Sequence, residues 1–204
     1  MTEPKLDYLF PKPLFTSNID RAFTTEEFQF IKKNKEIFYP NYQNTTSIDH
    51  DILEHREMAD IRAFVNDCLK AYVDKVMSPI KPTSLYVTQS WLNFSEPGQS
   101  HHVHSHPNSY VSGVFYINAE DGKDRINFHR SDTEFFQIVP KEYTPFNSPI
   151  YWNPVKTGDL ILFPSHIAHN VDPTESSGTR ISLAFNTFLK GNIGIEENLT
   201  RLWL

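Results

Sequence analysis

The second half of the chain reads as a series of short strands with turns between them. Segments rich in aromatic and β-branched residues are separated by turn pairs such as Pro97-Gly98, Asp121-Gly122 and Thr157-Gly158. The expected strands are Leu85–Ser95, His102–His106, Tyr110–Asn118, Arg125–His129, Ile150–Val155, Asp159–Pro164 and Arg180–Leu189. Many short strands without helices between them favour a β-sandwich or a barrel.

The first part of the chain predicts two helices that would support this β-rich body. Thr24 precedes Glu27 by three positions, a capping-box pattern that predicts a helix over Thr25–Lys33. An apolar stripe at steps of three to five residues predicts a second helix over Asp51–Met77, followed by prolines that end it. Before both, residues 8–19 read as a strand at a sheet edge or as an extended arm, because prolines interrupt them.

Composition and charge limit the kinds of partner that we expect the chain to bind. The net charge is −6 and no Lys/Arg-rich stripe is present, which argues against nucleic acid or an anionic membrane as the main partner. No signal peptide or membrane-length apolar run is visible, and the lone Cys68 suits a reducing compartment, so we expect a cytoplasmic protein. We expect a single domain: an arm with two helices over 1–82, the β-core over 83–190 and a tail over 191–204. The oligomeric state is left open, a homodimer included.

Six of the nine histidines gather in or just after two strand-like segments. They are His101, His102, His104, His106, His166 and His169. Alternate side chains of a strand share a face, so positions 102, 104 and 106 should point one way and position 101 the other. Imidazoles two residues apart lie roughly 7 Å apart at Cβ, and one metal ion can bridge them. A pair of this kind needs a distal third ligand, and His169 follows a strand that reads as buried.

An arginine and a serine follow the distal histidine with the phase of a single strand face. Arg180 and Ser182 would share one face of the strand Arg180–Leu189, whereas Ile181 and Leu183 would take the other. A guanidinium that faces a barrel interior needs a polar partner, and a dicarboxylate supplies one with bidentate geometry. The competing interpretation is a surface strand with a solvated Arg180.

These residues resemble the 2-oxoglutarate/iron(II)-dependent oxygenase superfamily. The stretch GDLILFPSHIAHNVDPTESSGTRISLAFN resembles its distal-histidine region, in which ten residues separate the histidine from Arg-x-Ser. The stretch WLNFSEPGQSHHVHSHPNSYVSGVFYIN resembles the first-ligand region of one branch, in which HxHP precedes an SGVYY strand. The resemblance implies a mainly β, double-stranded β-helix (jelly-roll, cupin-like) barrel with helices packed on one sheet.

The resemblance also implies the chemistry and the residues that would carry it. His104, His106 and His169 would bind Fe(II), and Arg180 with Ser182 would bind the distal carboxylate of 2-oxoglutarate. Asn93 is a further candidate contact to that co-substrate. Tyr110 and Tyr116 are others, although core or rim packing is the favoured interpretation of both tyrosines. The expected reaction consumes O2, converts 2-oxoglutarate to succinate with loss of CO2 and hydroxylates a substrate that the sequence does not identify.

One departure from the superfamily pattern keeps alternatives open. Most members carry His-x-Asp or His-x-Glu at the first position, whereas this chain has His104-Ser105-His106. His106 is then either a third imidazole ligand or a residue beside the metal, and His102 competes with His104 by face. The alternatives are a cupin-like three-histidine metalloenzyme that does not use 2-oxoglutarate and a non-catalytic jelly-roll binding module. The substrate would be a small molecule or a peptide side chain, with the loop over 131–149 shaping its pocket.

Overall fold

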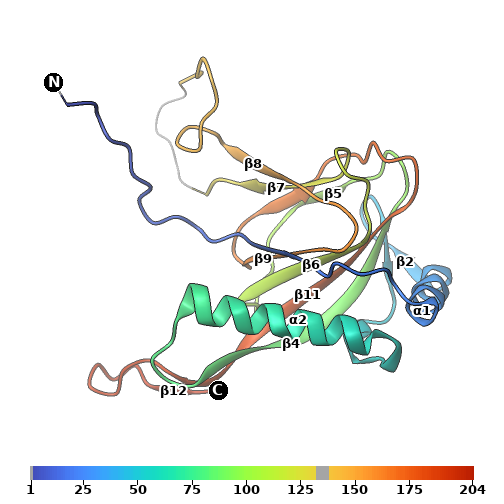
Figure 1. Ribbon diagram of the computed structural model, residues 1–204, viewed down its shortest axis with the longest axis horizontal. Coiled ribbons are helices and arrows are strands. Elements are labelled where there is room, and N and C mark those ends of the chain that lie inside the picture. The colour runs from blue at the N-terminus through green and yellow to red at the C-terminus, as the bar shows by residue number, and fades with distance from the viewer. Residues whose placement is uncertain (1, 132–137) are drawn as a thin grey trace.

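The computed structural model describes residues 2–131 and 138–204, and it folds into two facing antiparallel sheets with the helices outside the larger one (Figure 1). The larger sheet has the strand order β1-β9-β6-β11-β4-β3-β2, with β12 paired to β11. The smaller sheet has the order β5-β10-β7-β8. This is the mainly β jelly-roll architecture that the sequence predicts, and the fold prediction is confirmed.

Most of the predicted strands form close to their expected bounds. The strands are β1 (Phe15–Asn18), β2 (Phe38–Pro40), β3 (Thr45–Ser47), β4 (Thr83–Ser95), β5 (His101–His104), β6 (Val111–Asn118), β7 (Arg125–His129), β8 (Ile150–Pro154), β9 (Asp159–Pro164), β10 (His169–Val171), β11 (Arg180–Ile193) and β12 (Leu202–Trp203). The sequence did not predict β2, β3, β10 or β12, all of three residues or fewer. The predicted strand over residues 8–19 is confined to β1.

Strand β11 organises the larger sheet, because it pairs along its length with β4 on one side and with β6 on the other. Its side chains alternate as predicted. Leu183 and Phe185 are buried in the cluster that α2 (Ala59–Tyr72) covers, whereas Arg180 and Ser182 face the space between the sheets. Figure 1 shows α2 lying across the larger sheet on the side away from the smaller one. One strand therefore anchors the helical layer and supplies polar groups to the interior.

The helices begin as predicted in one case and later than predicted in the other. Helix α1 (Thr25–Glu36) starts at the predicted capping box: the Thr24 hydroxyl accepts from the Glu27 N–H, and the Glu27 carboxylate accepts from the Thr24 N–H. The predicted helix over 51–77 is wrong in its first turns. Two short 3-10 helices, η1 (Ile52–Glu54) and η2 (Arg56–Met58), precede α2, and a π-helical turn, η3 (Val73–Met77), follows it. The apolar stripe is nevertheless buried over these elements.

A contact with the larger sheet interrupts the start of the helix predicted over 51–77. The hydroxyl of Ser90 on β4 accepts a hydrogen bond of 2.8 Å from the Leu53 N–H. His55 then takes an extended backbone conformation, with φ −70° and ψ 146°, which interrupts helical geometry. Ile52, Leu53 and Met58 remain fully buried. Periodicity reports which residues are buried, and 3-10 turns can bury them as well as a continuous α-helix.

The next two predictions concern the division of the chain into segments and the loop over 131–149. The division into 1–82, 83–190 and 191–204 stays a prediction. The predicted pocket-shaping loop over 131–149 falls partly outside the described residues, including Glu134, Phe135 and Phe136, whereas its Tyr143 is exposed. Within the described chain, no helix combines the length and the apolar character needed to span a membrane.

The glycine of the SGVFY segment is explained by close packing at the centre of the larger sheet. Gly113 on β6 lies opposite Phe185 on β11, and a Cβ atom at position 113 would lie 2.1 Å from the Phe185 ring. Neither residue can move away easily, since Phe185 is 1% exposed beneath the helical layer. The aromatic ring therefore occupies the space that a side chain at 113 would need.

We predict that Gly113→Ala destabilises the fold by roughly 1–3 kcal/mol, the usual cost of forcing a methyl group into a packed core. Gly178→Ala is the matched control, because nothing lies within 4 Å of a Cβ atom at that position. Urea unfolding followed by fluorescence measures both variants. Equal stability of the two would contradict the packing argument.

Candidate metal centre

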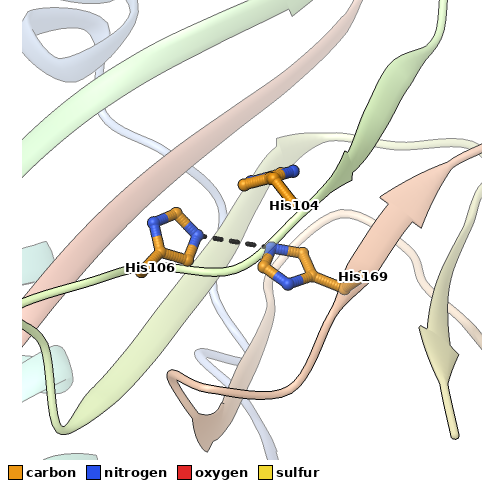
Figure 2. Close-up of side chains that lie close together, drawn as sticks. All are labelled: His104, His106 and His169. Carbon is orange, nitrogen blue, oxygen red and sulfur yellow. Dashed lines mark hydrogen bonds between the residues drawn. The ribbon is translucent and has the colours of Figure 1, made fainter. Parts of the chain in front are cut away.

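Three histidines from two neighbouring parts of the smaller sheet converge on one point. His104 ends β5, His106 follows in the next loop and His169 begins β10. One ring nitrogen from each lies within 4.8 Å of the other two, and Figure 2 shows the three rings turned toward one another. The register explains the approach, because His169 pairs directly with His104 across β10 and β5. The structure thus brings together the three residues that the sequence proposed as ligands.

Backbone carbonyls fix the orientation of two of the three rings. The Nδ1 atom of His104 lies 2.8 Å from the carbonyl oxygen of His102, and Nδ1 of His169 lies 3.0 Å from that of Ile167. A carbonyl can only accept, so each Nδ1 carries the hydrogen and each Nε2 keeps its lone pair. Nε2 of His169 lies 3.3 Å from Nε2 of His106. Ring orientation by a second hydrogen bond is typical of metal-binding histidines.

The electrostatics of the cluster favour neutral imidazoles. Burial, together with the neighbouring His104 ring, lowers the pKa of His169 to about 3 and that of His106 to about 4. Burial also lowers the pKa of His104, against the opposing effect of its bond to the His102 carbonyl. All three rings are therefore unprotonated near neutral pH, the state in which imidazole binds a metal ion.

The prediction for His101 is wrong, because β5 is irregular. Pairing with β10 shifts between His104, which is opposite His169, and His101, which is opposite Val171. Three steps along β5 thus match two along β10, and this bulge breaks the two-residue alternation. His101 consequently faces the same cavity as His104, with ring centroids 4.4 Å apart, whereas the sequence placed it on the opposite face.

The histidine cluster lies at the wall of a cavity of about 380 Å³ between the two sheets. Known ligand pockets run from about 300 to 1,000 Å³. Arg180, Ser182 and Asn93 line this cavity as predicted, and Tyr116 on β6 joins them. Tyr110, predicted with them, does not: it precedes β6, is 45% exposed and lines a separate groove. Its backbone N–H donates to the Thr187 carbonyl at 2.9 Å, which holds the chain outside the strand alternation.

Arg180 is the strongest electrostatic feature of the cavity. The residue is 3% exposed, and its Nη2 donates to the Ser95 hydroxyl at 3.3 Å. Its Nε and Nη1 atoms are buried and have no hydrogen-bond partner within the described part of the chain. A buried guanidinium with free donors is costly unless an acceptor anion completes it. This arrangement suits a carboxylate ligand, as the sequence argument for an inward-facing arginine requires.

The sequence did not identify one wall of the cavity. The β2–β3 hairpin contributes Tyr39, Asn41, Asn44 and Thr46 to the lining. Thr46 lies opposite Asn93 on β4 and donates to its Oδ1 at 3.1 Å. Strands of three residues give no clear period, so the pairing that carries these side chains into the cavity had no signal in the sequence.

Three other histidines, His129, His166 and His102, lie outside the cluster. His129 lies 2.8 Å from the amide oxygen of Asn170 through its Nε2, and His166 is exposed in the turn before β10. His102, the rival of His104, is exposed and stacks on His101 at a centroid distance of 4.9 Å. The geometry thus favours His104 over His102 as the partner of His106 and His169.

Comparison with solved structures gives the fold class of this site. The chain is similar to an oxidoreductase of the 2OG-Fe(II) oxygenase family from Burkholderia pseudomallei (11% identity, TM-score 0.57, covering 85% of this chain and 83% of that one). It is also similar to HygX from Streptomyces hygroscopicus, solved with nickel and 2-oxoglutarate bound (12%, TM-score 0.59, 86% and 82%). A Pseudomonas putida prolyl-4-hydroxylase is a third (15%, TM-score 0.54, 86% and 92%). The shared fold is that of the 2-oxoglutarate oxygenases.

A family model narrows the class. Residues 89–186, just under half of the chain, match the family described as "Putative 2OG-Fe(II) oxygenase". The matched residues run from within β4 to within β11 and include the three clustered histidines and Arg180. The resemblance predicted from the sequence is confirmed. No curated protein matches the sequence.

We predict that His104→Ala and His169→Ala each reduce the affinity for a divalent metal at least 10-fold, because one of three ligands is lost. The optical spectrum of added Co(II) measures binding. His166→Ala is the control, since this histidine is exposed outside the cluster. Retained affinity in both cluster variants would remove the three histidines as a metal site.

Proposed function

We propose that the protein is a 2-oxoglutarate- and Fe(II)-dependent dioxygenase that hydroxylates its substrate while 2-oxoglutarate is decarboxylated to succinate. One observation carries the proposal: the buried Arg180 guanidinium has two nitrogens, Nε and Nη1, without a partner among the described residues, and it lines the same cavity as the three-histidine cluster. A metal site alone would fit many proteins. A metal site with a buried, unsatisfied anion receptor fits a co-substrate that has a chelating end and a distal carboxylate.

The residues fit the metal that the family name implies. Imidazole is a suitable ligand for Fe(II), and three ligands on one side of an ion leave adjacent positions for other molecules. His104, His106 and His169 would hold the ion in this way. Bound iron and 2-oxoglutarate would supply the oxidising chemistry from O2, and the chain's own residues would bind, orient and exclude water.

Arg180 and Ser182 would bind the distal carboxylate of 2-oxoglutarate. Arg180 offers Nε–H and Nη1–H, and Ser182 lies two positions further along the same face of β11. Asn93 is opposite Ser182 on β4 and is 9% exposed, with its Oδ1 held by the Thr46 hydroxyl. The bond from Thr46 fixes the orientation of the Asn93 side chain. The Asn93 amide nitrogen would then donate a hydrogen bond to the co-substrate.

The cupin-like alternative uses the same three histidines as metal ligands but gives Arg180 no role in binding a co-substrate. It predicts a metal site in the smaller sheet whose affinity does not depend on the anion receptor that the larger sheet carries across the cavity. A non-catalytic binding module predicts no stoichiometric metal at all. We place the substrate among small molecules or peptide side chains because the cavity has a volume of only about 380 Å³. We place the protein in the cytoplasm.

We predict that Fe(II) and 2-oxoglutarate, added together without O2, produce a visible metal-to-ligand absorption band in the wild-type protein. Arg180→Ala should weaken 2-oxoglutarate binding about 100-fold, since it removes charge-assisted hydrogen bonds worth about 1.5–3 kcal/mol each. Titration of the band gives the affinity. Succinate release in air provides a second readout.

The variant's metal affinity is the internal control. Arg180 is not among the clustered histidines, so Co(II) binding should be unaffected by Arg180→Ala. A band of unchanged affinity in this variant would refute the role of Arg180 and favour the cupin-like alternative. Absence of the band in the wild type, with metal bound, would refute the proposed function.

A further inference from the structure

The cavity contains a second side chain with unsatisfied polar atoms, on the far side of β4 from Arg180 in the same sheet. Asn44 is 3% exposed, and neither its amide nitrogen nor its amide oxygen has a hydrogen-bond partner. Among the cavity-lining residues that the structure describes, only Arg180 and Asn44 have buried polar atoms in this state. An unsatisfied buried amide costs free energy, so it indicates a ligand that completes it.

The neighbours of Asn44 on the hairpin are already engaged. The Asn41 amide nitrogen lies 3.4 Å from the Thr46 hydroxyl and 3.3 Å from Nε2 of His101, and its oxygen accepts from the Tyr42 N–H at 2.8 Å. Thr46 donates to Asn93. Asn44 uses only its backbone, whose carbonyl accepts from the Asn41 N–H at 2.9 Å. Its side chain is therefore the available hydrogen-bonding group of this wall.

The hairpin is held in place across the cavity mouth, so Asn44 stands on a fixed support. Asn41 contacts His101, the Ser100 hydroxyl donates to the Gln43 amide oxygen, and the Tyr42 ring meets the His102 ring edge-on at 5.8 Å. These contacts join the edge of the larger sheet to β5, the edge of the smaller one. A binding group that is positioned before the ligand arrives loses less entropy on binding.

2-Oxoglutarate alone cannot satisfy both polar atoms of the Asn44 side chain. 2-Oxoglutarate as a dianion presents acceptor oxygens only, so it can accept from the Asn44 nitrogen but leaves the oxygen unsatisfied. Arg180 and Ser182 lie on β11, whereas Asn44 precedes β3, with β4 between the two strands. Arg180 pairs with Ser95 and Thr45 pairs with Phe94, so Asn44 and Arg180 flank the same end of β4, about two strand spacings or roughly 10 Å apart at the backbone. The Arg180 guanidinium reaches the Ser95 hydroxyl over β4, so a second ligand would lie beside the co-substrate, on the β3 side.

The charges of the cavity restrict that second ligand. Among the described residues that line it, none is an aspartate or glutamate, and Arg180 is the only lysine or arginine. A cationic group would meet no carboxylate, and an anionic group would compete with the co-substrate for the single guanidinium. A neutral polar group that both donates and accepts is left. An amide edge, N–H beside C=O, satisfies both atoms of Asn44 at once in a planar pair.

We propose that Asn44 recognises the primary substrate through an amide edge, supplied by a side-chain carboxamide or by a lactam ring. The inference rests on the proposed function, because it assigns the β11 wall to 2-oxoglutarate. It names the substrate by chemistry: a neutral amide, held on the β2–β3 side of the cavity and facing the histidine cluster.

Matched probes test the amide edge without knowledge of the natural substrate. One arm compares N-acetylglutamine methylamide with the same molecule carrying a side-chain N,N-dimethylamide; the other compares 1-methyluracil with 1,3-dimethyluracil. Binding to the Ni(II)- and 2-oxoglutarate-loaded protein is measured by ligand-observed NMR. We expect at least one parent probe to bind and its N-methylated partner to bind 10-fold more weakly, and the responding arm identifies the source of the amide. If neither parent binds at millimolar concentration, or the partners bind equally, the proposal is overturned.

Asn44→Leu provides the second measurement. It should weaken the responding probe at least 10-fold without lowering the melting temperature, because it removes two unsatisfied polar atoms from a buried position. Asn153→Leu on β8, outside the cavity, should bind the probe as the wild type does. Should Asn44→Leu weaken 2-oxoglutarate as Arg180→Ala does, Asn44 would belong to the co-substrate and the inference would fall. Failure of 2-oxoglutarate to bind the wild type would instead refute the proposed function.

Discussion

The alternation of side chains along β11 is the constraint on which the rest of the structure depends. Its outward residues, Leu183 and Phe185, are fixed beneath the helical layer, and its register with β4 and β6 is set over many residue pairs. A slip by one position would turn those residues into the space between the sheets and turn Arg180 toward the helical layer. The apolar core therefore holds the charged group inside, and the two cannot be separated.

The sequence contained enough to predict this part of the molecule. The strand β11 showed both its period and its inward polar residues, and β7 and β9 have the predicted bounds. The two-residue spacing of His104 and His106 and the later His169 indicated one metal site, and their rings do converge. These features come from local alternation, and a strand encodes its two faces in its own residues. The packing of the sheets and helices then follows, because each apolar face must be buried against another element.

What the sequence could not show depends on contacts between distant segments. His101 faces the cavity because of a bulge in β5 that only its partner β10 defines. Tyr110 lies outside because its backbone is bonded to Thr187, far along the chain. Asn44 reaches the cavity through a hairpin too short to have a period of its own. Each case is a property of pairing, and no window of neighbouring residues contains it.

The replacement of the usual carboxylate by His106 changes the charge balance of the cavity. Three neutral imidazoles would leave Fe(II) its two positive charges, and Arg180 adds a third within the same lining. No aspartate or glutamate among the described lining residues compensates these charges, so under the proposed function the dianionic co-substrate supplies most of the neutralisation. Coulombic attraction is strong where water is excluded. Metal and 2-oxoglutarate would then stabilise one another's binding more than in a site with a carboxylate ligand, and a neutral substrate is the partner that leaves this balance undisturbed.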